Sequence, residues 1–172
     1  MQTMSKLAVL LRRQRNGVRY CVLFALFTVM GFVGIYVAQD VIIAPLNRHF
    51  AWITVQLLQL VGIHITASGP MVALRSFVVE IRSNCNAIYE VGLYAAAVWA
   101  YPASWRRRLL GTLVGALVLY VVNVLRIMTL LAVGWMQPTW FEVTHLYVWQ
   151  MLYLLVVIIC WSVWLSRIRP GT

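Results

Sequence analysis

The segment LLGTLVGALVLYVVNVLRIMTLLAVGW, residues 109–135, decides the fold class of this chain. It is long and apolar enough to cross, as one helix, a bilayer whose hydrocarbon core is about 30 Å thick. Asn123 and Arg126 are its only strongly polar side chains. An arginine in lipid costs roughly 3 kcal/mol on insertion scales, so such a residue usually faces the protein interior and has a partner. Arg126 therefore predicts a buried partner, either structural or chemical.

The composition of the whole chain agrees with a membrane protein. Of 172 residues, 63% are hydrophobic, and the mean hydropathy is +0.84. We therefore expect an all-α polytopic membrane protein. The net charge is +10, but the Lys and Arg residues lie beside hydrophobic segments, where they set topology, so nucleic-acid binding is not expected. The three cysteines, Cys21, Cys85 and Cys160, lack the spacing of a metal site or a disulfide framework.

About four transmembrane helices are predicted, over residues 20–41, 84–101, 109–135 and 146–165. Basic clusters precede the first span, separate the second from the third, and follow the fourth. With four spans all three clusters fall on one side, and arginine-rich and lysine-rich loops face the cytoplasm. We therefore expect a single integral membrane domain over residues 1–172, with both termini cytoplasmic. The first span is as long as a full crossing and no small-x-small cleavage site follows it, so it is expected to remain uncleaved.

The outer-face segment, about residues 44–83, has a different pattern. Leu46–Val61 has apolar residues at helical spacing, interrupted by polar ones, and is a little short for a span. A span here would place Arg106–Arg108 outside, so an interfacial or re-entrant amphipathic helix is expected. After it, two stretches of β-branched and apolar residues flank Ser68-Gly69-Pro70, a turn signal. They predict a small β-hairpin that leads into Cys85.

The predicted topology places three chemically active residues at one depth. Arg126 is seventeen residues beyond Leu109, or about 26 Å along a helix, which is near the outer surface. Cys85 is at the outer start of the second span, and His145 is at the outer start of the fourth. Cys21 and Cys160 fall towards the cytoplasmic side, so Cys85 is the cysteine that can join Arg126 and His145.

A thiol, an imidazole and a guanidinium together suit cysteine acyl transfer. A cation lowers the pKa of a nearby thiol, and the thiolate is the attacking form. A histidine can accept the thiol proton and later return it to a leaving amine. An arginine can stabilise the oxyanion of a tetrahedral intermediate, more strongly where water is scarce. These residues predict an outward-facing acyl-transfer site.

A structural interpretation competes with this one. Arg126 could pair with Glu90, which lies about one turn below Cys85, as a structural ion pair. The chain would then be a non-enzymatic transporter component or assembly subunit. Asn123 could simply hydrogen-bond between helices. A membrane thiol oxidoreductase is a weaker alternative, because no second cysteine lies at the outer depth.

Three motifs resemble those of the exosortase/archaeosortase family of integral membrane sorting enzymes. Val79-Glu80-Ile81-x-x-x-Cys85-Asn86-Ala87-Ile88 resembles the family's cysteine motif, and Asn123-x-x-Arg126-Ile127 resembles its arginine motif. His145 matches the bacterial histidine position, and the similarity covers roughly residues 51–164. The family usually has a small residue and a glycine after the cysteine, where this chain has Asn86-Ala87. That Asn and the short chain resemble the exosortase H branch.

The resemblance implies a specific activity. Such enzymes recognise exported, membrane-anchored proteins by a C-terminal signal composed of a short motif, a transmembrane helix and a basic tail. They cleave at the motif, on the extracytoplasmic face of the bacterial inner membrane, through a cysteine thioacyl intermediate, and pass the acyl group to an acceptor. By analogy Cys85 is the nucleophile, Arg126 the electrostatic stabiliser and His145 the acid and base, with no metal or cofactor. The candidate supporting residues are Asn123, Glu90, Asn86 and Arg82.

Overall fold

The computed structural model describes residues 2–82 and 85–168, with side chains from Gln14 onward. Four helices in this part of the chain are long and apolar enough to cross a membrane, which confirms the predicted polytopic, mainly α-helical class. The elements in chain order are α1 (Gln2–Val37), α2 (Gln39–Leu60), β1 (Thr66–Ser68), β2 (Met71–Leu74), β3 (Phe77–Glu80), α3 (Ile88–Ala100), α4 (Trp105–Met136), α5 (Pro138–Val143), a π-helical turn (Thr144–Val148) and α6 (Trp149–Ile168).

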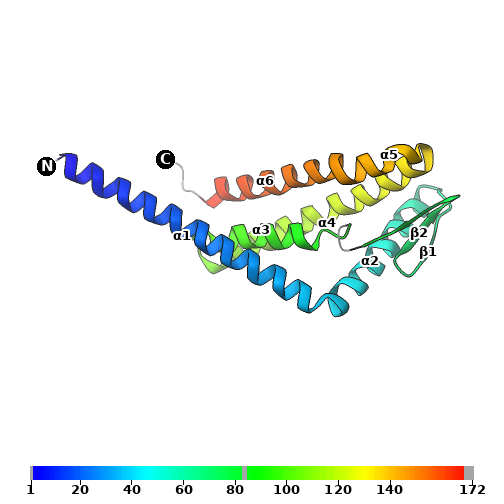
Figure 1. Cartoon of the computed structure of the whole chain (residues 1–172), viewed down its shortest axis with the longest axis horizontal. Coiled ribbons are helices and arrows are strands. Elements are labelled where there is room, and N and C mark those ends of the chain that lie inside the picture. Colours follow the sequence, from blue (N-terminus) through cyan, green and yellow to red (C-terminus); the bar gives the residue numbers. More distant parts are fainter. Residues whose placement is uncertain (1, 83–84, 169–172) are drawn as a thin grey trace.

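The helices run along the long axis of an elongated molecule (Figure 1). α4 and α6 lie side by side and antiparallel, and α3 packs against α1, α4 and α6. The start of α1, the start of α4 with Arg106–Arg108, and the end of α6 lie towards one end, which we call the basic end. The sheet and α5 lie at the opposite end, which we call the sheet end. The described residues of the basic clusters thus share an end as expected, with Arg169 outside the described residues, and the assignment of that end to the cytoplasm stays a prediction.

Helix α3 is shorter than the span predicted over residues 84–101. It begins at Ile88 and ends at Ala100, so its 13 residues extend about 20 Å, less than a hydrocarbon core of about 30 Å. The chain before it is a turn, in which Ala87 has the left-handed backbone conformation (φ 57°). Cys85 therefore lies in this turn ahead of the helix. By length and composition α2 is the fourth candidate span in place of α3.

The amphipathic helix predicted at Leu46–Val61 is part of the longer helix α2. The break between α1 and α2 falls at Ala38, a few residues before the predicted end of the first span, and Pro45 is accommodated inside α2. One face of α2 is buried and packs on the sheet and on α4. The buried residues are Asn47, Phe50, Ala51, Thr54, Val55 and Leu58. That α2 is an interfacial or re-entrant amphipathic helix stays a prediction, as does its position relative to the membrane.

The predicted hairpin is two strands of a three-stranded antiparallel sheet, in the order β1-β2-β3. Thr66 pairs with Ala73 around the expected Gly69-Pro70 turn, in which Gly69 has φ 62°. A second turn at Arg75-Ser76 folds β3 back on β2. Arg75 adopts φ 53° in this turn. Because no glycine or proline marks the turn in the sequence, the stretch from Leu74 to Ile81 was expected to form one strand.

Two tyrosines hold the helices together between the basic end and the site. The Tyr94 hydroxyl donates to the Gly111 carbonyl (2.9 Å), and the Tyr153 hydroxyl donates to the Leu119 carbonyl (2.6 Å). Gly115 makes room for the Tyr94 ring, which a Cβ at this position would overlap. Both rings are fully buried, so α3 and α6 are fixed against α4 by hydrogen bonds within an apolar core.

Candidate active site

Cys85 and His145 lie in contact although they are 60 residues apart in sequence. The Cys85 Sγ atom is 3.1 Å from the His145 Nε2 atom, within hydrogen-bond distance for sulfur. Cys85 is 7% exposed and comes from the turn between β3 and α3. His145 is partly buried and comes from the last long helix. The pair therefore joins a thiol and an imidazole at the junction of the sheet and the helices.

A π-helical turn carries His145. The last long helix opens at Pro138, so His145 lies two turns inside it instead of at its start, where it was predicted. π-helical turns are rare and often occur at functional sites. The His145 ring is stacked on Phe141, with ring centroids 5.7 Å apart, and Phe77 of β3 packs edge-on against Phe141 at 5.3 Å. Gly134 leaves room for Phe77, so the sheet positions the imidazole through two aromatic rings.

The Cys85 turn is held from two helices. The Asn123 side-chain amide on α4 donates to the Cys85 carbonyl at 2.9 Å. The Asn86 amide donates to the Asn47 Oδ1 atom on α2 at 2.7 Å, and the Asn86 Oδ1 atom accepts from the Ile88 backbone N–H at 3.1 Å. Asn86 thereby satisfies one of the free N–H groups at the start of α3. Both asparagines predicted as supporting residues position the turn.

Ala87 lies at a place where glycine fits best. Its left-handed conformation brings the Cβ of an L-residue close to the following carbonyl oxygen, at a cost of about 1–2 kcal/mol. Ala87 is buried, so the turn is fixed in this conformation by its surroundings. A small residue followed by glycine, the more usual pair after the cysteine in the family described above, would adopt the same turn without this cost.

Arg126 is 1% exposed and is the largest fully buried side chain in the described structure. It lies on α4 one turn beyond Asn123, and its guanidinium carbon is 5.8 Å from the centre of the Tyr153 ring. Its Nε and Nη1 groups have no hydrogen-bond partner. The ion pair found among the described side chains joins Arg82 and Glu80 (2.7 Å). Arg126 and Glu90 therefore do not form an ion pair with each other. A buried cation with free donors is costly in isolation and is suited to an oxygen atom of a ligand.

The Cys85 thiol needs a neighbouring base to form the thiolate. Burial raises the pKa of Cys85 above its ordinary value of 9.0, and the positive charge of Arg126 opposes this effect. At neutral pH the resting form is therefore the neutral thiol. His145 is in hydrogen-bond contact with it and can remove its proton. The charge of Arg126 acts on both Cys85 and His145.

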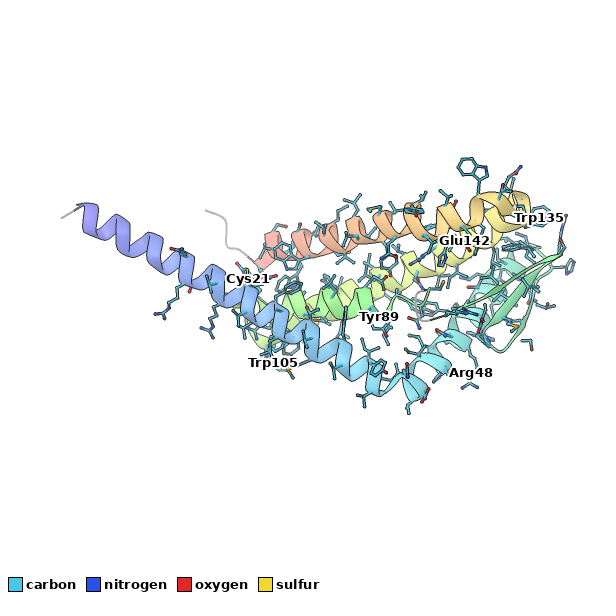
Figure 2. The ribbon with its side chains drawn as sticks, viewed as in Figure 1. Cys21, Arg48, Tyr89, Trp105, Trp135 and Glu142 are labelled. Carbon is cyan, nitrogen blue, oxygen red and sulfur yellow. The ribbon has the colours of Figure 1, made fainter. Side chains whose placement is uncertain are left out.

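Of the other predicted residues, Arg82 contacts Cys85 through its backbone, because its carbonyl accepts from the Cys85 N–H at 2.8 Å, and the charge of Glu90 acts on the Cys85 thiol. Arg82 is exposed and bonded to Glu80, and Glu90 is partly buried on α3. Cys21 is exposed on α1, far along the molecule from the labelled Trp135 and Glu142 (Figure 2). Cys160 lies on α6 towards the basic end, lining a cavity with Tyr94, so neither of these cysteines reaches Cys85. Within the described residues no group of three or more His, Cys, Asp or Glu side chains could hold a metal ion.

Two residues of the site were not predicted from the sequence. In the sequence, Asn47 is one of the polar residues that interrupt the apolar pattern of Leu46–Val61. Tyr153 looks like an ordinary aromatic residue in an apolar span, although it is eight residues after His145 and hence close to the same face of that helix. Its position in space beside Arg126 depends on how α4 and α6 pack.

Comparison with known proteins identifies the family of the chain. No curated protein and no solved structure matches it. The family model of the transmembrane exosortases matches residues 4–162 of the 172, a range that includes Cys85, Arg126 and His145. This match confirms the family predicted from the three motifs: the chain belongs to the transmembrane exosortase family.

Proposed function

We propose that this protein is a cysteine endopeptidase and transpeptidase that processes exported, membrane-anchored proteins. It cleaves a C-terminal sorting signal on the extracytoplasmic face of the bacterial inner membrane and transfers the new carboxyl end to an acceptor. The observation that carries the proposal is the 3.1 Å contact between Cys85 Sγ and His145 Nε2, together with a buried Arg126 whose charge acts on both residues and whose Nε and Nη1 donors are free. Membership of the exosortase family supports sorting-signal processing as the task.

The first step forms a thioester. With its proton on Nδ1, His145 accepts the Cys85 thiol proton on Nε2, and the thiolate attacks the carbonyl carbon of the scissile peptide. The carbonyl oxygen becomes an oxyanion, which the free Nε–H and Nη1–H groups of Arg126 stabilise. As the carbon–nitrogen bond breaks, His145 gives its proton to the leaving amine. Cys85 then carries the acyl group.

The second step releases the product. The acceptor nucleophile attacks the thioester carbonyl while His145 removes its proton, and Arg126 again stabilises the oxyanion. When the carbon–sulfur bond breaks, the Cys85 sulfur takes up the proton from His145. Water in place of the acceptor would give hydrolysis, so the acceptor decides between transpeptidase and protease chemistry.

The rival proposal, a non-enzymatic membrane subunit, required a structural ion pair between Arg126 and Glu90. The described structure has no such pair, and it leaves two Arg126 donors free while the Arg126 charge acts on the Cys85 thiol and the His145 imidazole. A structural role alone does not account for a buried cation whose Nε and Nη1 donors have no hydrogen-bond partner. The enzyme interpretation accounts for it, because the substrate supplies the missing acceptor.

The test uses a reporter protein fused to a sorting signal and expressed together with this protein. Cys85→Ala should abolish cleavage of the reporter, since no other thiol lies at the site. Cys160→Ala is the matched control, because this cysteine lies on α6 away from His145, and it should process the reporter normally. In addition, hydroxylamine should release reporter that is trapped on wild-type protein as a thioester. Cleavage by the Cys85→Ala protein at the wild-type rate would refute the proposal.

A further inference from the structure

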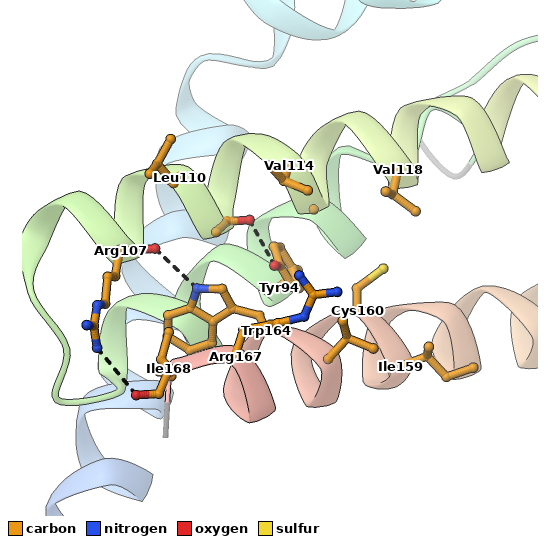
Figure 3. A pocket seen from close by; sticks show the side chains of 13 residues that line it. Tyr94, Arg107, Leu110, Val114, Val118, Ile159, Cys160, Trp164, Arg167 and Ile168 are labelled. Atoms are coloured by element: carbon orange, nitrogen blue, oxygen red, sulfur yellow. Dashed lines mark hydrogen bonds between the residues drawn. The ribbon is translucent and has the colours of Figure 1, made fainter. Parts of the chain in front are cut away.

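A groove between α4 and α6 near the basic end has no role in the proposed chemistry. Its volume is about 580 Å³, and Figure 3 shows the side chains that line it. Most of these side chains are apolar and several are exposed to the surroundings of the protein. The apolar lining residues include Leu110, Val114, Val118, Ile159 and Val163. In a membrane such a groove faces lipid and can hold an acyl chain.

The length of the groove along α4 matches the thickness of one membrane leaflet. On α4 its lining extends from Arg107 to Val118, and these eleven steps correspond to about 16 Å of helix. Half of a hydrocarbon core about 30 Å thick is about 15 Å. An acyl chain that enters at the level of Arg107 would therefore follow the groove to the middle of the bilayer.

The charges of the groove lie at its basic end. Arg107 of α4 and Arg167 of α6 both line it, and no Asp or Glu does. Arg107 donates to the Ile168 carbonyl (3.4 Å), while the Trp164 indole N–H donates to the Arg107 carbonyl (3.1 Å). These two bonds hold the ends of α4 and α6 together. In Figure 3 the Arg107 guanidinium lies on one side of the Trp164 indole and the Arg167 guanidinium on the other side, towards Cys160. Gly111 leaves space for the indole ring.

We propose that this groove binds an anionic phospholipid. Arg107 and Arg167, whose planar donor groups match phosphate oxygens, attract its anionic headgroup, and one acyl chain packs along Val114 and Val118. Basic pockets between transmembrane helices on the cytoplasmic side commonly hold such lipids. The helix of a sorting signal is a poorer occupant, because its basic tail would meet the two arginines. The proposal does not depend on the proposed enzymatic activity.

The experiment measures which lipid stays bound. Purified full-length protein is mixed with vesicles containing equal parts of phosphatidylcholine and phosphatidylglycerol, re-extracted, and analysed for retained lipid by native mass spectrometry. The wild-type protein should retain phosphatidylglycerol in preference to phosphatidylcholine. The double variant Arg107→Gln with Arg167→Gln should lower that preference about thirtyfold. This figure is the usual contribution of one basic residue to binding an anionic lipid surface, doubled for two residues and converted to a ratio of affinities.

Two controls separate a site from general attraction. Arg15→Gln with Arg19→Gln removes the same charge from exposed positions on α1 and should leave the preference unchanged. Val114→Trp fills the groove without changing charge and should abolish retention, whereas Leu113→Trp, at the adjacent exposed position outside the groove, should not. Equal retention of both lipids, an equal loss in the α1 variant, or full retention by Val114→Trp would each overturn the proposal. So would displacement of the lipid by a sorting-signal peptide.

Discussion

Replacing Arg126 by lysine separates a catalytic arginine from a structural one. Lysine keeps the positive charge but loses the planar fork that presents Nε–H and Nη1–H together, the two donors that are free in the structure. Loss of one oxyanion donor typically lowers the rate by a factor of about 10²–10³, or about 2.7–4 kcal/mol of transition-state stabilisation. We therefore expect Arg126→Lys to process a sorting-signal reporter at least a hundredfold more slowly while the protein accumulates normally.

The same residue allows a test of the missing ion pair. Breaking a buried ion pair by removing one partner costs about 3–5 kcal/mol, because the other charge is left uncompensated. Since Arg126 and Glu90 are not paired, Arg126→Leu alone should accumulate in membranes about as well as Arg126→Leu with Glu90→Leu. Both should be inactive.

The assay is the initial rate of reporter cleavage in isolated membranes, normalised to the amount of folded protein. Arg48→Lys is the matched control, since Arg48 is exposed on α2 and should tolerate the change. Wild-type activity in Arg126→Lys, or activity in the double leucine variant, would refute the oxyanion role. If the Arg126→Leu protein fails to accumulate in membranes, and adding Glu90→Leu restores its abundance, then the ion pair exists.

Three further predictions concern the parts that hold the site. Ala87→Gly should raise the free energy of unfolding of the purified protein by up to about 1 kcal/mol, because it removes the steric strain of an alanine in the left-handed conformation. As a control, Ala96→Gly inside α3 should lower the free energy of unfolding by about 1 kcal/mol. A loss of stability in Ala87→Gly would contradict this. In a His145→Ala variant that keeps Cys85 as its sole cysteine, the rate of Cys85 alkylation should increase with pH and should still be increasing at pH 9.0, because burial raises the pKa of the thiol. A rate that reaches a plateau at lower pH would be inconsistent with a buried neutral thiol. Phe141→Ala should slow processing about tenfold by freeing the His145 ring, and Phe141→Tyr should restore it, so equal rates in the two variants would exclude the stacking role.

The family and the fold class were predicted correctly from the sequence. Residues 109–135 and the overall hydropathy require membrane-spanning helices, whatever the details of packing. Because an α-helix rises about 1.5 Å per residue, the height of a side chain along its span can be counted from the end of that span. This is why Cys85, Arg126 and His145 could be placed at one depth before their contacts were known. The three motifs then added the family, which the family match confirms.

Rotation about a helix axis and local departures from ideal geometry were decided by the tertiary structure. Glu90 and Arg126 have similar predicted heights, but the packing of α3 on α4 leaves them unpaired, and the packing of α6 on α4 brings Tyr153 beside the guanidinium. The turn at Arg75 lacks a glycine or proline signal. His145, in the π-helical turn, contacts Phe141 of the same helix and also Cys85, a residue far away in sequence. A sequence gives the order and height of its polar groups, whereas their facing partners depend on packing between segments that are distant in the chain.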